Sequence, residues 1–199
     1  MIAQAVRLRA LPSGRPGGDA DAEAIRDIVS FWRGSTHDWF AKNSNFDCRF
    51  HDRFLTIHED AGARRHDNWM EAPVGALALL ILTDQFPRNA FRGTPRMYAT
   101  DPLARDYARA ALDAGHPDAV AANEKLFFGL PFAHSEELAD QEISVAFHRA
   151  RLGEPWLSHA KGHRAIIRRF GRFPHRNAIL GRVSTPEEEA FLTQGGFAG

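Results

Sequence analysis

The sequence predicts an all-α fold of about eight helices in a single compact domain. Apolar residues recur at helical spacing in segment after segment, and residues that start or stop helices separate these segments. No segment shows a sustained alternation of apolar and polar residues between hairpin turns, which is the pattern of a β-strand. We therefore expect a helical-hairpin array without a sheet.

The first two predicted helices have clear ends. Apolar residues recur every three or four positions from Asp21 onward, and Gly34 provides a stop. Ser44 can cap the second helix, whose apolar stripe closes at Gly62. Both segments should bury one face against the rest of the domain.

The third predicted helix begins at Pro73, which suits the first helical turn, and runs to Gln85. It is apolar around most of its circumference between positions 74 and 82, so we expect it at the centre of the domain. Pro87 is expected to end it, because proline has no backbone N–H and clashes with the preceding turn.

The next three helices follow from caps and prolines. Asp101, followed by a proline, predicts a helix start, and Gly115 predicts the end of that helix. A fifth helix is expected over 120–130, ending before Pro131, because the residue preceding a proline is pushed out of helical geometry. Ser135 is expected to cap the sixth.

The last two predicted helices span 156–173 and 186–192. Thr185 and Glu188 have the spacing of a capping box, in which each side chain binds the backbone N–H of the other residue. The final helix therefore has a well-marked start.

The composition fits one domain with its own core. The chain has 199 residues, 44% of them hydrophobic, which is the usual size of a single compact domain. Residues 1–18 combine arginine, proline and glycine and are expected to form a flexible arm, so the predicted domain is 19–199. The most apolar run, 74–82, falls well short of the roughly 20 residues of a membrane-spanning helix. We expect no membrane segment.

The single cysteine, Cys48, cannot form an internal disulfide. This favours a reducing compartment, because disulfide frameworks belong to oxidising ones. The sequence therefore predicts a cytoplasmic protein.

The charge is balanced overall but not locally. The chain has 25 basic and 25 acidic residues, which does not indicate a protein that binds polyanions. Between Glu154 and Glu187, however, every charged residue is basic. Nucleic-acid binding is still not favoured, because no exposed aromatic residues interleave with this basic face, and a solvated face is the simpler interpretation. The basic residues of the interval are Lys161, Arg164, Arg168, Arg169, Arg172, Arg176 and Arg182.

His159 and His163 fall on the arc of their helix that also carries Ile166 and Phe170, so both side chains are expected to point inward. A histidine pair at this spacing can bind a metal, but the glutamate of the metalloprotease motif is missing. Hydrogen-bonded core histidines are the preferred interpretation. The sequence predicts no metal and no cofactor.

Two polar positions stand out near predicted helix ends. Asp84 is expected in the last turn of its helix, where an acid opposes the helix dipole at a cost of about 0.3–1 kcal/mol. A cation from Arg88 or from the basic C-terminal segment would offset this cost. His134 precedes a predicted helix start, where free N–H groups can hold an anion, with a plain cap as the alternative.

Two short segments, 86–90 and 173–178, repeat a Phe-Pro-Arg-Asn-Ala pattern, the second with an extra histidine. Each is expected to follow a helix, with the proline ending it and Arg and Asn donating to its free carbonyls. Duplicated segments should share one backbone course. Loop chemistry common to many proteins is the alternative.

Several longer motifs, taken together, resemble the bacterial domain-of-unknown-function 924 family from about Ile28 to the C-terminus. The motifs are 82–89, 100–104, 130–136 with Asp140 and Gln141, and 169–177 continuing through 180–182. The resemblance implies an all-helical fold grouped with the tetratricopeptide-like superfamily and no established activity. No 34-residue period is present, so the concave groove of true tetratricopeptide repeats is not expected.

The polar residues of these motifs, together with His163, form the candidate ligand-binding set. Its members are Asp84, Arg88, Asn89, His134, Glu136, Gln141, His163, Arg169, Arg172, His175, Arg176 and Asn177. So many polar residues are more than packing alone requires.

The leading hypothesis is a helical domain whose pocket of arginine, histidine and asparagine binds a small anionic ligand or an acidic peptide. The alternative is an enzyme of unknown class in which His134, His163 or His175 acts as acid or base, oriented by Glu136 or Asp84. The leading hypothesis also predicts that five residues converge in space: Asp84, Arg88, His134, Arg172 and Arg176.

Overall fold

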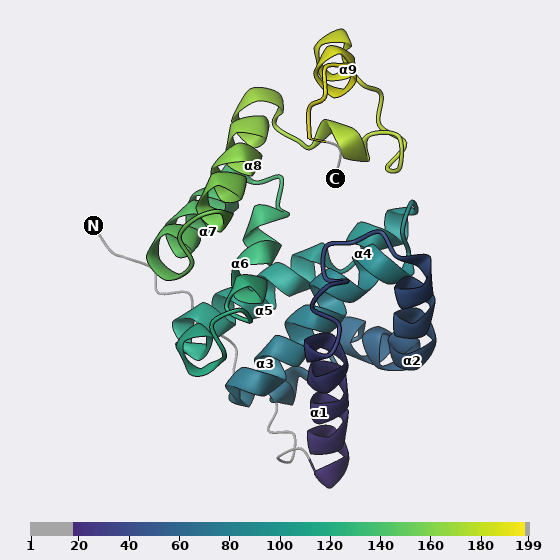
Figure 1. Cartoon of the computed structure of the whole chain (residues 1–199), viewed down its shortest axis with the longest axis vertical. Coiled ribbons are helices and arrows are strands. Elements are labelled where there is room, and N and C mark those ends of the chain that lie inside the picture. The colour runs from purple at the N-terminus through teal and green to yellow at the C-terminus, as the bar shows by residue number, and fades with distance from the viewer. Residues whose placement is uncertain (1–17, 198–199) are drawn as a thin grey trace, which may run out of the picture.

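A computed structural model describes residues 18–197, and all of its regular structure in this range is helical (Figure 1). The α-helices are α1 (Asp19–Arg33), α2 (Ser44–Gly62), α3 (Pro73–Leu80), α4 (Phe86–Ala90), α5 (Asp101–Asp113), α6 (Leu126–Ala133), α7 (Leu138–Arg151), α8 (Trp156–Phe170) and α9 (Pro186–Thr193). A π turn joins α3 and α4 into one continuous helix, which leaves eight separate helices. The predicted fold class and helix number are confirmed.

Between residues 18 and 197, no helix is both long enough and apolar enough to cross a membrane. The N-terminal arm predicted for 1–18 lies, up to residue 17, outside the described residues.

The main core lies between α1, α2, α3 and α6 and is rich in aromatic rings. Trp32 of α1 contacts Phe50 of α2 and Phe127 of α6, with ring centroids 5.5 and 5.3 Å apart. Leu77 and Leu79 of α3 are fully buried, as expected for the helix that is apolar all round. The burial of these rings is the principal stabilisation of the N-terminal two-thirds of the chain.

The C-terminal third continues from this core. α7 and α8 form a hairpin that packs on α6, and the segment that carries α9 lies beyond the end of α8 (Figure 1). Gly171, with φ of +69°, ends α8 at Phe170, three residues before the predicted end. The short 3₁₀ turn Pro174–Arg176 then brings its side chains back toward α6.

Two helix starts differ from the prediction by one residue each. The cap of α2 is Asn43 rather than Ser44, and its side-chain oxygen accepts hydrogen bonds from two N–H groups of the first turn at 3.1 and 3.3 Å. Asp101 is the first residue of α5 rather than its cap, because its carboxylate pairs with Arg88 instead. The capping box of α9 is confirmed, as is the predicted stop of α1 at Gly34.

The start of α7 also moves. Its N-cap position is Glu137, not Ser135. The Ser135 hydroxyl still accepts a hydrogen bond from the Glu137 N–H at 3.1 Å, and it donates to Asp140 at 2.7 Å. Ser135 therefore fixes the turn before α7 without being its cap.

The prediction that Pro87 and Pro131 end helices is wrong. Pro131 lies inside α6, which spans 126–133 rather than 120–130. Pro87 lies in α4, after the π turn of Ile81–Gln85. The missing N–H of Pro87 would leave the Thr83 carbonyl free, but the Thr100 hydroxyl donates to it at 2.6 Å.

The proposed repeat of segments 86–90 and 173–178 is also wrong. Phe86 is helical, with φ −52° and ψ −50°, and it continues the helix from the π turn. Phe173 is extended, with φ −88° and ψ 109°, and it follows a helix that has already ended. The two segments have different backbone courses, so their similarity is one of composition.

Candidate functional site

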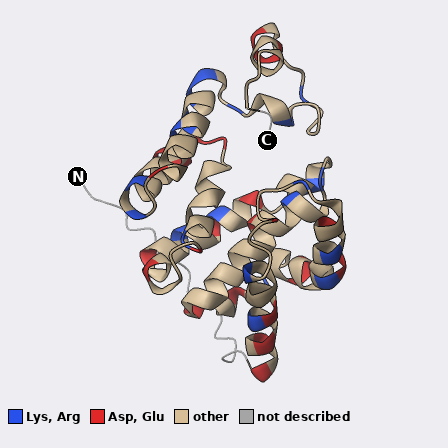
Figure 2. Ribbon diagram, in the orientation of Figure 1, with Lys and Arg blue, Asp and Glu red and all other residues tan. Residues whose placement is uncertain are grey.

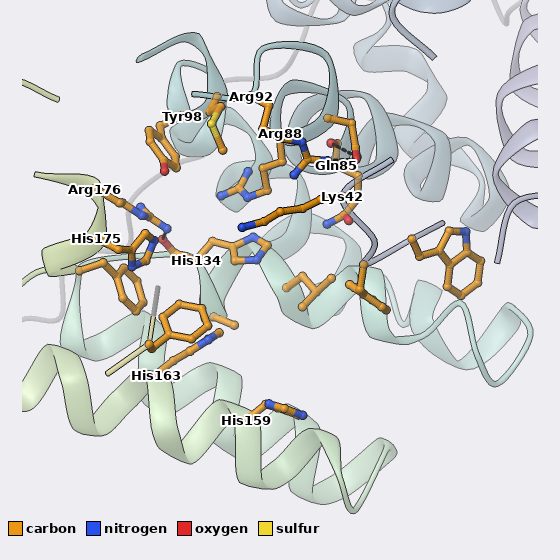
Figure 3. Close-up of a pocket in the computed structure, with 18 of the residues that line it drawn as sticks. Lys42, Gln85, Arg88, Arg92, Tyr98, His134, His159, His163, His175 and Arg176 are labelled. Atoms are coloured by element: carbon orange, nitrogen blue, oxygen red, sulfur yellow. Dashed lines mark hydrogen bonds between the residues drawn. The ribbon is translucent and has the colours of Figure 1, made fainter. Parts of the chain in front are cut away.

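A cavity of about 740 Å³ lies where α4, α6, α8 and the C-terminal segment meet (Figure 3). Its described lining contains no Asp or Glu side chain. It does contain four basic residues, Lys42, Arg88, Arg92 and Arg176, and five histidines, His134, His148, His159, His163 and His175. Figure 3 shows the labelled side chains gathered around one space from segments far apart in the sequence.

One polar wall is built on the contact between His134 and Asp84. His134 is the residue after α6, and its Nδ1 lies 2.8 and 3.1 Å from the two carboxylate oxygens of Asp84 in the π turn. The Asp84 side chain is only 1% exposed. Gln85 donates a further hydrogen bond to Asp84 at 2.6 Å. The carboxylate thus lies behind the cavity wall and holds the imidazole at its surface.

Asp84 is not in the last turn of a helix, so the predicted conflict with the helix dipole is wrong. The predicted compensation by Arg88 is correct, since Arg88 Nη1 lies 3.2 Å from the carboxylate. Burial acts to raise the pKa of Asp84, but the charge of Arg88 and then the contact with His134 outweigh it and lower the pKa to about 2. Asp84 is therefore ionised at neutral pH.

His134 has a lowered pKa, first because of burial and then because of the positive charge of Arg88. Asp84 acts in the opposite direction without reversing the shift. The imidazole is therefore neutral at pH 7, and its Nδ1–H points at an ionised carboxylate.

Arg88 is fully committed to its neighbours. Its two terminal nitrogens donate to the two carboxylate oxygens of Asp101 at 2.8 and 3.0 Å, and one of them also donates to the Asp84 carbonyl at 2.7 Å. Burial acts to lower its pKa, but the two carboxylates raise it. Two negative charges surround this guanidinium, which therefore offers no net positive charge to the cavity.

Arg176 has much weaker partners. Its side chain is 8% exposed, and its nearest carboxylate oxygen, on Asp101, is 3.8 Å away. One terminal nitrogen donates to the His134 carbonyl at 2.9 Å, while its buried Nε has no hydrogen-bond partner. Its guanidinium stacks between the rings of Tyr98 and Phe173, each at 4.6 Å. Burial and the charge of Arg88 lower its pKa. Arg176 is a buried cation without a close counter-ion.

His163 and His175 are neutral for a different reason. Burial lowers the pKa of His163 to about 3, and burial together with Arg176 lowers that of His175 to about 4. The Nδ1 atom of each is buried without a hydrogen-bond partner. Both rings contact Phe197, with centroids 4.7 and 5.1 Å apart. Neither histidine is oriented by a carboxylate.

The cavity lining also contains a group of apolar residues. Trp39 and Phe40 come from the loop after α1, and Trp156 comes from the start of α8. The Phe40 and Trp156 rings lie 5.5 Å apart. Leu130 of α6 and Ile179 of the C-terminal segment complete this surface. The cavity lining thus combines cationic and histidine side chains with aromatic and aliphatic ones.

The structure brings together seven of the twelve predicted site residues. Six line the cavity: Arg88, Asn89, His134, His163, His175 and Arg176. Asp84 lies directly behind them, as described. Asn89 also donates to the Gln85 carbonyl at 3.0 Å, so it stabilises the helix after the π turn.

The other five predicted residues lie outside the cavity lining, because each has a structural partner. Arg172 pairs with Glu188 at 2.6 Å, so its predicted convergence with Arg176 and His134 is wrong. Arg169 pairs with Glu187 at 2.8 Å, and Asn177 donates to Glu188 at 3.2 Å.

Glu136 accepts two hydrogen bonds from Arg182 and one from the Phe173 N–H. Gln141 donates to the carbonyl groups of Phe132, Ala133 and Ser135 at the end of α6. These residues hold the C-terminal segment and the turn that carries His134. The polar residues of the motifs therefore include both residues that line the cavity and residues that hold the surrounding segments in place.

The basic face of α8 was expected to be simply solvated, but two of its arginines form ion pairs with α7. Arg164 and Arg168 both pair with Glu142 of α7, at 2.8 and 2.6 Å. Figure 2 shows both signs of charge spread over the helices. His163 points inward as predicted, but His159 is exposed although it borders the cavity. Among the described residues, no group of His, Cys, Asp and Glu could hold a metal ion.

Several cavity residues could not be identified from helical spacing. Lys42 and Trp39 lie in a loop that has no periodic pattern, and Arg92 and Tyr98 lie between the helices α4 and α5. Gln85 belongs to one of the motifs, but the sequence predicts only that it ends a helix. Only the fold places these residues around one space.

Comparison with known proteins gives a consistent result. The model of a family described as "Bacterial protein of unknown function (DUF924)" matches residues 28–196. Among solved structures, the protein of unknown function ATU0120 from Agrobacterium tumefaciens is similar, with 49% sequence identity and a TM-score of 0.85. The match covers 87% of this chain and 99% of that one. No curated protein matches.

Proposed function

This chain belongs to the DUF924 family of bacterial proteins, as its motifs indicate, and we propose that its cavity binds a small organic anion with an apolar body. The observation that carries the proposal is Arg176. A guanidinium that is 8% exposed and has its nearest carboxylate oxygen 3.8 Å away is costly to bury. An anionic group of a ligand would supply a closer counter-charge and could accept a hydrogen bond from Nη1, which has no hydrogen-bond partner among the described residues.

The absence of carboxylates from the described cavity lining supports the sign of the ligand charge. Lys42, which has no ion-pair partner among the described residues, adds a second positive charge to the lining. Arg88 and Arg92 add little, because Asp101 and Asp47 pair with them. This balance favours a monoanion, such as a carboxylate, over a highly charged ligand.

The apolar residues of the lining support the apolar body of the ligand. A volume of about 740 Å³ is typical of sites for small molecules, which combine an apolar lining with a few fixed polar groups. The burial of Arg176 favours such a molecule over an acidic peptide, whose charges would be presented by a wider surface. The histidines would add neutral hydrogen-bonding groups beside the anion.

Two further points, the cellular compartment and the grouping of the fold, complete the proposal. We place the protein in the cytoplasm because its only cysteine, the exposed Cys48, suits a reducing compartment. The hairpin of α7 and α8 supports grouping the fold with tetratricopeptide-like helical arrays.

A thermal-shift screen with aliphatic and aromatic monocarboxylates tests the proposal. A ligand at 100 times its dissociation constant should add about 2.7 kcal/mol to the free energy of unfolding. The Arg176→Met variant should lose this stabilisation, whereas the control Arg168→Met, which removes an exposed arginine of α8, should keep it. The proposal fails if no monocarboxylate stabilises the protein, or if both variants respond as the wild type does.

A further inference from the structure

The contact between His134 and Asp84 fixes the chemical state of the imidazole. Asp84 is an ionised acceptor, so the hydrogen of the neutral ring is on Nδ1 and is donated to the carboxylate at 2.8 Å. The other nitrogen, Nε2, then carries a lone pair. It forms no hydrogen bond with any described residue, and the side chain is 19% exposed on the cavity wall. A carboxylate that holds a histidine in this tautomer is the arrangement of a general base.

No other cavity histidine has this support. The Nδ1 atoms of His163 and His175 are buried without a partner. His148 uses its Nδ1 on the Ser144 carbonyl at 2.7 Å, and His159 forms no contact with a carboxylate in the described part of the chain. Glu136, the other carboxylate considered from the sequence, is occupied by Arg182. Of the candidate bases, the geometry supports His134 alone.

The residues around His134 limit the class of reaction that this site could catalyse. The described lining offers no serine, threonine or cysteine as a nucleophile, so the proton that His134 can remove most directly is that of a water molecule. Arg176 donates to the His134 carbonyl through Nη2, and its Nη1, which forms no hydrogen bond with any described residue, can donate to a developing negative charge. This is the pairing of a base and a charge-stabilising donor that hydrolysis of an acyl group needs.

We propose that this cavity hydrolyses an ester of a carboxylic acid with an apolar body, with His134 as the general base, Asp84 as its positioning residue and Arg176 as the donor to the oxyanion. His134 Nε2 takes a proton from water while the water oxygen bonds to the ester carbonyl carbon. The carbonyl oxygen becomes an oxyanion beside Arg176. The bond to the alkoxy oxygen then breaks, and the imidazolium returns the proton to the leaving alcohol.

The products are a carboxylic acid and an alcohol, and no oxidation occurs. The acid, once ionised, is an anion of the class that the proposed function assigns to the cavity. The inference therefore extends the proposed function to a reaction, and the two can fail separately. The site would bind the acid product even if His134 had no role in chemistry.

Hydrolysis of p-nitrophenyl acetate and p-nitrophenyl butyrate by the purified full chain tests the inference. His134→Gln should lower kcat/KM by at least 100-fold, as expected for loss of a general base. His51→Gln, on the surface of α2, is the control and should keep the wild-type rate. Asp84→Asn should lower kcat with little change in KM, because it keeps the shape of the cavity but replaces a carboxylate, which can only accept, with an amide that can also donate to Nδ1 and so does not fix the tautomer.

Two further readouts separate chemistry from folding. Added imidazole should restore hydrolysis to a His134→Gly variant above the rate that the same imidazole gives without protein, which a merely misfolded protein would not show. The wild-type rate should rise with pH through the pKa of His134 and then level off, and His134→Gln should lose this dependence. Burial, Arg88, Asp84 and Asp101 shift this pKa. The charged and titratable groups that lie around His134 are Asp84, Arg88, Asp101, His148, His163, His175 and Arg176.

Each remaining outcome is decisive. Equal rates for the wild type and His134→Gln would overturn the inference, and retained thermal stabilisation of both proteins by monocarboxylates would leave the binding proposal intact. A stable acyl adduct on Lys42, detected by mass spectrometry, would show that Lys42 and not water is the nucleophile, which would also overturn the inference. Hydrolysis of p-nitrophenyl phosphate in place of the esters would refute the acyl class.

Discussion

Replacing either of two arginines that line the same cavity should have very different effects on stability. Arg88 forms two hydrogen bonds with Asp101 and lies 3.2 Å from Asp84, whose side chain is 1% exposed. Arg88→Met leaves both acids in place without their main cation. Removing one partner of a buried pair costs about 3–5 kcal/mol, so we expect the free energy of unfolding to fall by this amount.

Arg176→Met should behave differently. It removes one hydrogen bond to the His134 carbonyl, which is worth about 1.5–3 kcal/mol for a charged donor, but it also removes the cost of burying an uncompensated cation. Met also keeps much of the contact with Tyr98 and Phe173. These effects oppose each other, so the net change should stay within about 1 kcal/mol.

Urea denaturation at pH 7, followed by circular dichroism, gives both values. The m-values should stay equal to that of the wild type, so that the midpoints report stability alone. Equal losses for the two variants would refute the assignment of Arg88 to the framework and Arg176 to the ligand. So would a loss below about 1 kcal/mol for Arg88→Met, since two buried carboxylates would then tolerate its absence.

Three further predictions concern stability. His163 and His175 stay neutral in the folded protein down to about pH 3 and 4, whereas an unfolded histidine takes up a proton near pH 6.5. The free energy of unfolding should therefore fall as the pH drops from 6.5 toward 4, by up to about 1.4 kcal/mol per pH unit for each histidine. A urea midpoint that stays constant over this range would contradict the prediction. Gly129→Ala should lower the melting temperature, with a cost of about 1–3 kcal/mol, because the added Cβ would lie 2.6 Å from a ring carbon of Phe147; calorimetry showing an unchanged or higher value would be inconsistent with this contact. Asn43→Ala should cost about 1 kcal/mol by removing the cap of α2, which chemical denaturation can measure against a wild-type control.

The helical class was accessible from the sequence because helical spacing and caps are local signals. Gly34 and the capping box at Thr185 act within one helical turn, and both are confirmed. Asp101 shows where a prediction from neighbouring residues in the sequence fails. Its type and its position before a proline predict a cap, but a carboxylate can bind only a limited set of donors, and Arg88 takes it.

The site was partly accessible for the same reason. Arg88 and Asp84 are four residues apart, so their pairing follows from helical geometry once the helix is known to continue. The contact of His134 with Asp84 spans 50 residues and depends on how α6 packs. Arg172 looked equivalent to Arg176 in sequence, and only the position of Glu188 in α9 separates the two.

The π turn at Ile81–Gln85 makes the cavity depend on the number of residues in a helix as well as on their identity. A π turn accommodates one residue more than the α-helical repeat. Deleting a single residue there would restore a regular α-helix, and the segments on both sides, with Arg88 and Asn89, would keep their phase because the turn absorbs the extra residue. The backbone that carries Asp84 and Gln85 would change, and with it the contact between Asp84 and His134. A one-residue change of length could therefore remove the support of His134 in a protein that still folds, and a one-residue insertion into an ordinary helix is a short route by which such a site could arise.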